Sequence, residues 1–195
     1  MRALDVDPIH GTRRTFRALC DAMSRPGTVH QTPTVPADYA VTATLVDHEV
    51  TFHSSDEELT AALAGQGRLE AADPSEADVV HAGRSPSWDV RDLNRGSLVE
   101  PSAGATVIYR VNELAATPEK DLTAVTVSGP GVDGTTTFGV GLPAAELDAL
   151  ADVQSDYPRG IDAIFTSADR VAALPRSVSL RVADGEYVPE NGGDH

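Results

Sequence analysis

The chain contains almost no lysine. Of its 15 basic residues only Lys120 is a lysine, and 30 acidic residues bring the formal net charge of the 195-residue sequence to −15 at pH 7. Proteins that bind nucleic acid neutralise its phosphates with clustered lysine and arginine, and a negative overall field repels a polyanion. The composition therefore argues against a nucleic-acid partner, while a local cluster of arginines is still able to hold a small phosphate compound.

The acidic excess has two interpretations. Because 41% of the residues are hydrophobic and helix and strand patterns are clear, it does not indicate a disordered chain. It is typical of a halophilic protein, since in concentrated salt the Debye length falls to roughly 3 Å and carboxylates no longer repel one another strongly. The alternative is an acidic face that docks a basic partner.

The halophilic interpretation makes a prediction about salt. We expect the melting temperature to fall when molar salt is diluted to low-millimolar salt, because the carboxylates then repel one another without screening. Thermal melts across that range measure the effect. A melting temperature that does not change would contradict the halophilic interpretation.

Cysteine is nearly absent too. Cys20 is the single cysteine, which excludes an intramolecular disulfide and any zinc or iron–sulfur site built on several thiolates. Phe16, Leu19, Cys20 and Met23 fall at i, i+3, i+4 and i+7 of a helix predicted over residues 8–24. That spacing marks one helical face, so we expect Cys20 to pack in the core.

Long apolar runs are also missing. No window approaches 18 consecutive apolar residues, and the first ten residues, MRALDVDPIH, contain no apolar stretch of signal-peptide length. We expect a cytoplasmic protein without a transmembrane span.

The hydrophobic pattern alternates between helix and strand along the chain. Helices are predicted over 8–24, 39–46, 87–94 and 143–153, with one more after a capping box at Ser55 and Glu58. Strands are predicted over 50–53, 79–81, 105–111, 122–127, 136–140, 161–166, 171–174 and 178–182. This order favours an α/β three-layer sandwich with a mixed sheet, in a single domain over 1–182. Residues 183–195 are acidic and glycine-rich and are predicted to form a flexible tail.

Two patterns suggest metal or cofactor chemistry only weakly. His48, Glu49 and His53 lie across a helix-to-strand junction, where the spacing does not put both imidazoles on one face, so we expect no metal site. Lys120 is the only side-chain amine able to form a Schiff base, but it lies in the polar run TPEKD. A solvated loop leaves its pKa too high for a nucleophile, so we expect no covalently bound cofactor.

Two segments are candidates for anion binding. Ser128, Gly129 and Gly131 belong to an SGPG turn after a strand, where glycines let the backbone approach a phosphate; a plain turn between strands is the alternative. Asp162 and Arg176 each interrupt an apolar segment, so each is either paired inside the protein or faces a cleft. An internal salt bridge and a ligand site both remain open for this pair.

Four segments resemble a known family in order and spacing. They are FRALCDAMSRPGTV (16–29), LVEPSAGATVIYRV (98–111), VSGPGV (127–132) and YPRGIDAIFTSADRVAALPRSVSLRV (157–182). Together they resemble the PhnH subunit of the carbon–phosphorus lyase system for phosphonate use, over about residues 8–182. Residues 65–98 offer little to match.

The resemblance implies a subunit of a multi-subunit core complex. In that system a methylphosphonate displaces adenine from the ribose of ATP to give a ribose phosphonate triphosphate, and a separate subunit breaks the carbon–phosphorus bond. The resemblance further implies a homodimer whose fold is similar to the large domain of pyridoxal-phosphate transferases but without that cofactor. The expected partners are the other core subunits.

Two functions therefore remain open at this stage. The first is a non-catalytic or jointly catalytic subunit of the phosphonate ribosyl-triphosphate synthase. The second is a stand-alone enzyme on a phosphorylated small molecule, with arginine and glycine clamps and Asp162 as base. The predicted ligand-binding residues are Arg25, Ser128, Gly129, Gly131, Gly160, Asp162 and Arg176, because an arginine fork matches phosphonate geometry with two parallel hydrogen bonds.

Overall fold

The computed structural model describes residues 10–83 and 86–183, so the predicted tail from residue 184 onward lies outside the described residues. The helices are α1 (His10–Ser24), α2 (Ala37–Leu45), α3 (Glu57–Ala64) and α4 (Ala144–Gln154), with short 3₁₀ turns η2 (Val90–Asp92) and η3 (Pro101–Ala103). The strands are β1 (His30–Gln31), β2 (Thr51–Ser54), β3 (Glu70–Ala71), β4 (Val79–Ala82), β5 (Thr106–Arg110), β6 (Leu114–Ala115), β7 (Thr123–Ser128), β8 (Thr135–Val140), β9 (Asp162–Thr166), β10 (Arg170–Leu174) and β11 (Ser179–Val182). Within the described ranges, no helix is both long enough and apolar enough to cross a membrane.

A seven-stranded mixed sheet forms the centre of the molecule, in the order β1-β10-β9-β5-β4-β2-β3. Strands β3, β2, β4, β5 and β9 are parallel, whereas β10 and β1 are antiparallel to their neighbours. A second, antiparallel sheet has the order β11-β7-β8-β6. The predicted α/β class with a mixed sheet is therefore confirmed.

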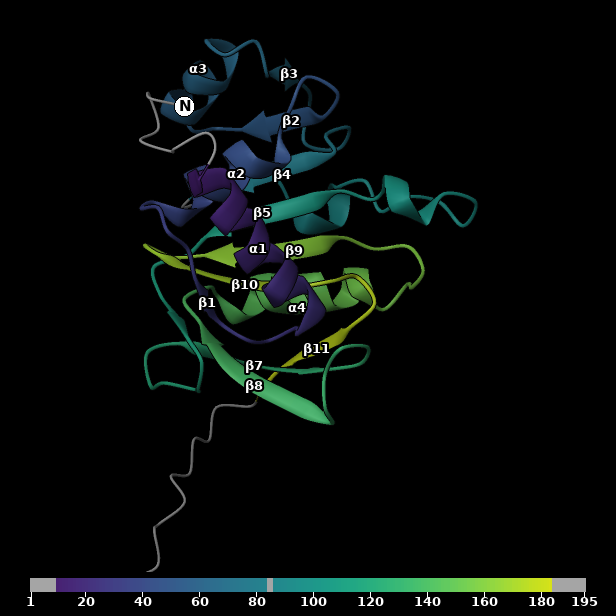
Figure 1. The fold of residues 1–195 in the computed structure, drawn as a ribbon. Helices are drawn as coiled ribbons and strands as arrows, with labels where there is room; N and C mark the ends of the chain where they lie inside the picture. The colour runs from purple at the N-terminus through teal and green to yellow at the C-terminus, as the bar shows by residue number, and fades with distance from the viewer. Residues whose placement is uncertain (1–9, 84–85, 184–195) are drawn as a thin grey trace, which may run out of the picture.

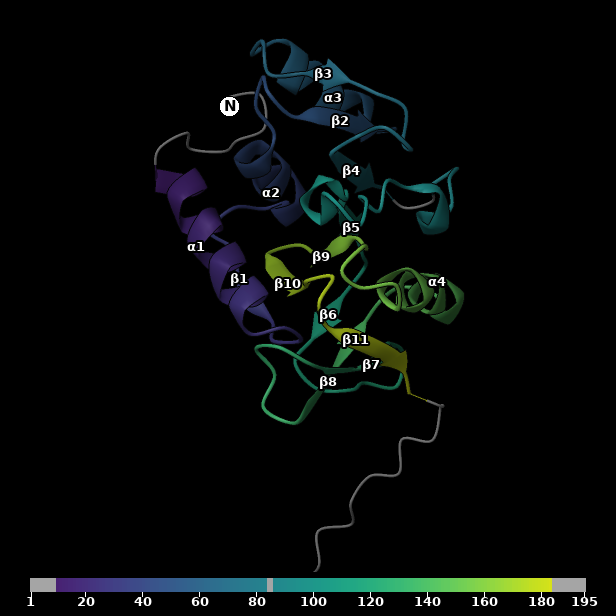
Figure 2. The same cartoon turned by 90° about the vertical axis from the view of Figure 1, so that its right-hand side faces the viewer.

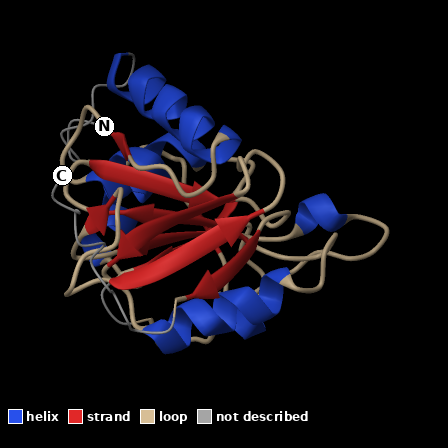
Figure 3. Ribbon diagram, turned by 90° about the horizontal axis from the view of Figure 1, so that it is seen from below, coloured by secondary structure: helices blue, strands red, loops and turns tan. Residues whose placement is uncertain are grey.

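The central sheet has a different cover on each face (Figures 1 and 2). Helices α1, α2 and α3 cover one face, where Ile108 and Ile164 belong to the apolar cluster that includes residues of these helices. Helix α4 and the second sheet cover the other face, where Tyr109 and Phe165 are buried and their rings stack with centroids 5.5 Å apart. Seen from below, helices lie on both sides of the strands (Figure 3). The third layer is thus part helix and part sheet.

The first helix is rotated relative to the sequence prediction. Its buried residues are Gly11, Thr15, Ala18, Leu19 and Ala22. The expectation that Cys20 packs in the core is wrong, because its side chain is exposed. Phe16 is also 54% exposed. Most of these buried residues are small, which lets α1 lie close to α2 and β10. The close packing of the helix stabilises this orientation more than burial of Phe16 and Cys20 would.

Two local predictions need correction. The helix predicted over 87–94 is only the single turn η2, which Asp89 caps by accepting a hydrogen bond from the Arg91 backbone N–H. Helix α3 begins one residue later than a cap at Ser55 would require, because the Asp56 carboxylate accepts from the backbone N–H of Leu59. This choice of cap places a carboxylate at the end of β2.

Gly27 provides a test of packing between α1 and the second sheet. Its φ is +83°, and a Cβ at this position would lie 2.6 Å from Cγ2 of Val127. We expect Gly27→Ala to lower the free energy of unfolding by about 2–3 kcal/mol, from left-handed backbone strain and overpacking together. Urea unfolding measures the loss.

Gly67→Ala is the matched control for this variant. Gly67 also has a positive φ, of +65°, but no heavy atom lies within 4 Å of a Cβ built there. We expect a loss of only about 1 kcal/mol, from the backbone strain alone. Equal losses at the two glycines would contradict the packing argument.

Candidate functional site

Polar side chains converge where the parallel strands of the central sheet end. Ser54 is the last residue of β2, His81 lies near the end of β4 in register with it, and Arg110 is the last residue of β5. Asp38 from the first turn of α2 and Asp56 from the cap of α3 approach the same edge. We name these five residues the carboxyl-edge cluster. In open α/β sheets ligands bind at the carboxyl ends of the strands.

His81 links a serine to a buried carboxylate. Its Nε2 lies 2.9 Å from Oδ2 of Asp38, and its Nδ1 lies 2.9 Å from Oγ of Ser54. His81 is 1% exposed and Asp38 is 2% exposed. A ring that carries its proton on Nε2 satisfies both contacts, since Nε2–H donates to Asp38 and Nδ1 accepts from the Ser54 hydroxyl. The three side chains therefore form a hydrogen-bonded relay.

Arg110 joins the two carboxylates of the cluster. Its Nε donates to Oδ2 of Asp38 at 2.6 Å, and its Nη2 donates to Oδ2 of Asp56 at 2.9 Å. The guanidinium also lies over the ring of Tyr39, 5.0 Å from the centroid, and the Tyr39 hydroxyl donates to Asp56. These charge-assisted contacts fix the position of all four side chains.

The cluster keeps its carboxylates ionised. Burial works to raise the pKa of Asp38, but the hydrogen bond from His81 and the Arg110 charge lower it below its ordinary value. Burial likewise opposes ionisation of Asp56, and the backbone N–H of Leu59 and the Tyr39 hydroxyl more than offset it, so its pKa is lowered as well. Burial and the neighbouring Asp56 raise the pKa of Tyr39. Both carboxylates of the cluster are therefore held in the ionised form at neutral pH.

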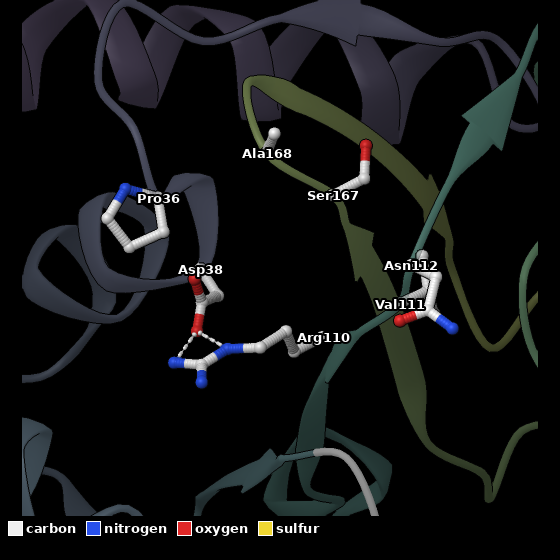
Figure 4. Close-up of a pocket in the computed structure, with 7 residues that line it drawn as sticks. All are labelled: Pro36, Asp38, Arg110, Val111, Asn112, Ser167 and Ala168. Atoms are coloured by element: carbon white, nitrogen blue, oxygen red, sulfur yellow. Dashed lines mark hydrogen bonds and ion pairs between the residues drawn. The ribbon is translucent and has the colours of Figure 1, made fainter.

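The cluster opens into a small pocket (Figure 4). The pocket has a volume of about 170 Å³ and is lined by Pro36, Asp38, Arg110, Val111, Asn112, Ser167 and Ala168. In Figure 4 the Arg110 guanidinium reaches Asp38 through two nitrogens. Nη1 of Arg110 and Oδ1 of Asp38 form no hydrogen bond with the described residues. The two N–H donors of Nη1 and one carboxylate oxygen of Asp38 are therefore without a partner among the described residues.

The two lowered carboxyl pKa values predict acid sensitivity. Because Asp38 and Asp56 titrate lower in the folded protein than their ordinary value of 3.8, their contribution to stability is complete above that pH. It is lost as the pH falls from about 4 through the folded values. Urea unfolding between pH 6 and pH 3 measures this loss. We expect the free energy of unfolding to fall less steeply with decreasing pH in Asp38→Asn than in wild type. Equal slopes of the free energy against pH would contradict the prediction.

Asp162 and Arg176 are brought together by the structure. Oδ2 of Asp162 lies 2.5 Å from Nη2 of Arg176, and the guanidinium also donates to the carbonyls of Pro101 and Gly104. Their side chains are 19% and 15% exposed. Gly160 lies against this pair, because a Cβ there would be 3.1 Å from Cβ of Arg176. The salt bridge considered from the sequence is present, and the ligand role of these residues stays a prediction.

The other predicted site residues lie at a different place. Arg25 is exposed and forms an i, i+4 ion pair with Asp21. A Cβ at Gly131 would meet the carbonyl oxygen of Ser24, so the SGPG turn packs against the end of α1 beside Arg25. Ser128 ends β7, and Gly129 contacts Val178. No described residue of the carboxyl-edge cluster belongs to this group.

The sequence reasoning missed the carboxyl-edge cluster entirely. His81 and Arg110 interrupt the apolar strands VVHA and TVIYR, which is the same signal that singled out Asp162 and Arg176. Combined with the rule that parallel strands present their carboxyl ends to ligands, it points to this edge. Asp38 carried no comparable signal, because nothing in PADYA indicates a buried carboxylate.

Among the described residues we looked for metal-ligand clusters and for a lysine placed to form a Schiff base. Among residues 10–83 and 86–183, no group of three or more histidine, cysteine, aspartate or glutamate side chains is placed to hold a metal ion. Lys120 is exposed in the loop before β7. His53, one of the histidines considered for a metal, contacts the carbonyl of Ala72 through Nδ1.

Comparison with known proteins identifies the family. The family model described as bacterial phosphonate metabolism protein (PhnH) matches residues 5–181. The chain belongs to the PhnH family. A PhnH protein of Rhizobium meliloti (strain 1021), named alpha-D-ribose 1-methylphosphonate 5-triphosphate synthase subunit PhnH, is 28% identical over 191 residues, covering 89% of this chain and 92% of that relative. A second relative, from Stutzerimonas stutzeri and named "Putative C-P lyase subunit protein HtxG", is 32% identical over 88 residues, which is 45% of this chain and 43% of that protein.

Proposed function

We propose that this chain is a subunit of an alpha-D-ribose 1-methylphosphonate 5-triphosphate synthase in a carbon–phosphorus lyase complex. It would support the step in which methylphosphonate displaces adenine from the ribose of ATP. The observation that carries the proposal is the match to the PhnH family over residues 5–181, together with the relative that aligns over 92% of its own length.

The geometry of the carboxyl-edge cluster favours a subunit over a stand-alone enzyme. Its pocket of about 170 Å³ is smaller than the roughly 300–1,000 Å³ that enclose most small-molecule ligands. Among the residues that line the pocket, Arg110 is the one basic side chain, and it already pairs with Asp38 and Asp56. A triphosphate needs more positive charge than this cluster offers. A substrate such as ATP would therefore need groups supplied by another chain.

A stand-alone enzyme that uses Arg176 as an anion clamp has less support. Its guanidinium is already occupied by Asp162 and by the carbonyls of Pro101 and Gly104. A ligand would have to replace these partners.

Five further features belong to the same proposal. The fold is similar to the large domain of pyridoxal-phosphate transferases, the cofactor is absent, and the chain acts in the cytoplasm as a homodimer with other core subunits as partners. The exposed position of Lys120 supports the lack of that cofactor, since a Schiff-base lysine is normally desolvated. The sheet with helices on both faces agrees with the proposed fold relationship.

Deletion of the gene in the source organism tests the proposal. We expect loss of growth on methylphosphonate as the sole phosphorus source and normal growth on phosphate, with rescue by the wild-type gene. Adenine release from ATP and methylphosphonate should require the reconstituted complex and should be absent with the isolated chain. Unchanged growth on methylphosphonate, or adenine release by the isolated chain, would overturn the subunit role.

A further inference from the structure

The outer face of α1 is basic, although the protein as a whole is acidic. Helix α1 and the next residue, Arg25, contain four arginines and one aspartate, a net charge of +3 in a chain of net charge −15. Arg13, Arg14 and Arg17 are exposed. None of them forms an ion pair with a residue that the structure describes. Of the four arginines, Arg25 alone is paired within the described part of the chain, with Asp21.

An aromatic side chain and a thiol lie beside these charges. Arg13, Arg17 and Cys20 follow one another at i, i+4 and i+7, so they form a single stripe opposite the buried residues of the helix. Phe16 borders this stripe and is 54% exposed. We call Arg13, Phe16, Arg17 and Cys20 the outer stripe. Figures 1 and 2 show α1 on the outside of the helical layer, with no described helix or strand over it.

We infer that the outer stripe docks this chain onto an acidic surface of another subunit of its complex. The inference rests on the function proposed above. Exposed arginine and aromatic side chains together are typical of protein interfaces, where they supply most of the binding energy. The arginines choose an acidic partner by charge, and Phe16 supplies an apolar anchor among them.

A second copy of this chain fits the stripe poorly. A two-fold dimer interface is self-complementary, so α1 would face α1 and unpaired arginines would approach one another. Nucleic acid also fits poorly, because the rest of the chain is strongly negative and repels a polyanion beyond the small patch. A different chain with a carboxylate-rich face satisfies the charges.

Cys20 is a probe of this surface already present in the chain. It is the single cysteine and it is exposed. The rate at which N-ethylmaleimide alkylates Cys20 is measured by mass spectrometry of this chain. The rate in the isolated protein is compared with the rate in the complex assembled with the other subunits, at the same salt concentration. We expect alkylation at least about tenfold slower in the complex, because the partner covers the thiol.

Charge reversal tests the same surface by a second route. We expect Arg13→Glu with Arg17→Glu to weaken binding to the other subunits about 100-fold or more, and Phe16→Ala about 30-fold. Arg181→Glu is the matched control, since Arg181 is an exposed arginine of β11 in the second sheet, away from α1. It makes the same charge change per residue and should bind within about twofold of wild type. Melting temperatures confirm that all variants fold.

The outcomes separate the two proposals. Assembly of the wild-type complex with Cys20 still reactive and the Glu variants still bound would overturn the docking surface and leave the proposed function intact. Failure of the wild-type chain to assemble with the other subunits would overturn both. A homodimer that dissociates on Phe16→Ala, or DNA binding that the double variant alone loses, would assign the stripe to another occupant and reject the inference.

Discussion

Arg110→Ala is expected to destabilise the protein by about 3–5 kcal/mol. Asp38 is 2% exposed, and its carboxylate relies on the charge of Arg110 and on the hydrogen bond from His81. Removing one partner of a buried ion pair leaves the other charge desolvated and unpaired, which costs more than the pair itself contributes. For a chain of this size the loss corresponds to a fall in melting temperature of roughly 10 °C. Urea unfolding at pH 7 measures it.

A double variant identifies the cause of that loss. If the unpaired carboxylate is responsible, adding Asp38→Asn to Arg110→Ala should recover part of the stability, because the amide carries no charge to compensate. Arg91→Ala is the control, since Arg91 makes two ion pairs at an exposed position and its loss should change stability little. A double variant less stable than Arg110→Ala would show that the cost comes from lost packing.

Arg176→Ala is expected to destabilise the protein by about 2–5 kcal/mol. Its side chain is 15% exposed, and its guanidinium joins two other segments of the chain, β9 through Asp162 and the η3 turn through the carbonyls of Pro101 and Gly104. Figure 1 shows the segment that contains η3, in teal, extending away from the sheet beyond β5. The loss would unpair Asp162 and release two carbonyls. Arg176→Lys should recover only a small part, because an ammonium does not reproduce the fork.

Growth measurements separate this structural role from the predicted ligand role. An Arg176→Ala protein that is destabilised, and that restores growth on methylphosphonate at low temperature, would reject ligand binding by Arg176. A protein that stays folded and fails to support growth would favour it. Arg159→Ala is the control, because Arg159 lies next to the same loop and its ion pair with Asp156 is only half-buried, at 40% side-chain exposure for each partner. We expect little change in either measurement.

The Asp162–Arg176 pair and the carboxyl-edge cluster show which site residues a sequence can reveal and which it cannot. Asp162 and Arg176 were found because each interrupts an apolar segment, and the structure brings them into one ion pair. His81 and Arg110 interrupt strands in the same way. Their meaning depends on Asp38, which is 43 and 72 residues away in sequence. Only the packing of α2 on the sheet brings that carboxylate to them.

Helix α1 shows the limit of periodicity. The spacing of Phe16, Leu19, Cys20 and Met23 correctly indicates a helix, but only Leu19 and Met23 face the core, while Phe16 and Cys20 are exposed. The alternative stripe of Thr15, Ala18 and Ala22 has the same period but smaller side chains. Local hydrophobicity favours the first stripe, and close approach to α2 and β10 favours the second. That choice depends on the shape of the neighbouring elements, which no local pattern contains.

The sequence alone determined the α/β class, most helices and strands, and the family, because these depend on local periodicity and on ordered motifs along the chain. The acidic surface was equally evident from composition. The tertiary structure alone decided which face of α1 is buried, the second sheet in the third layer, and the relay of Ser54, His81 and Asp38. These features join residues distant in sequence, and the free energy of such contacts is set by packing and burial in three dimensions.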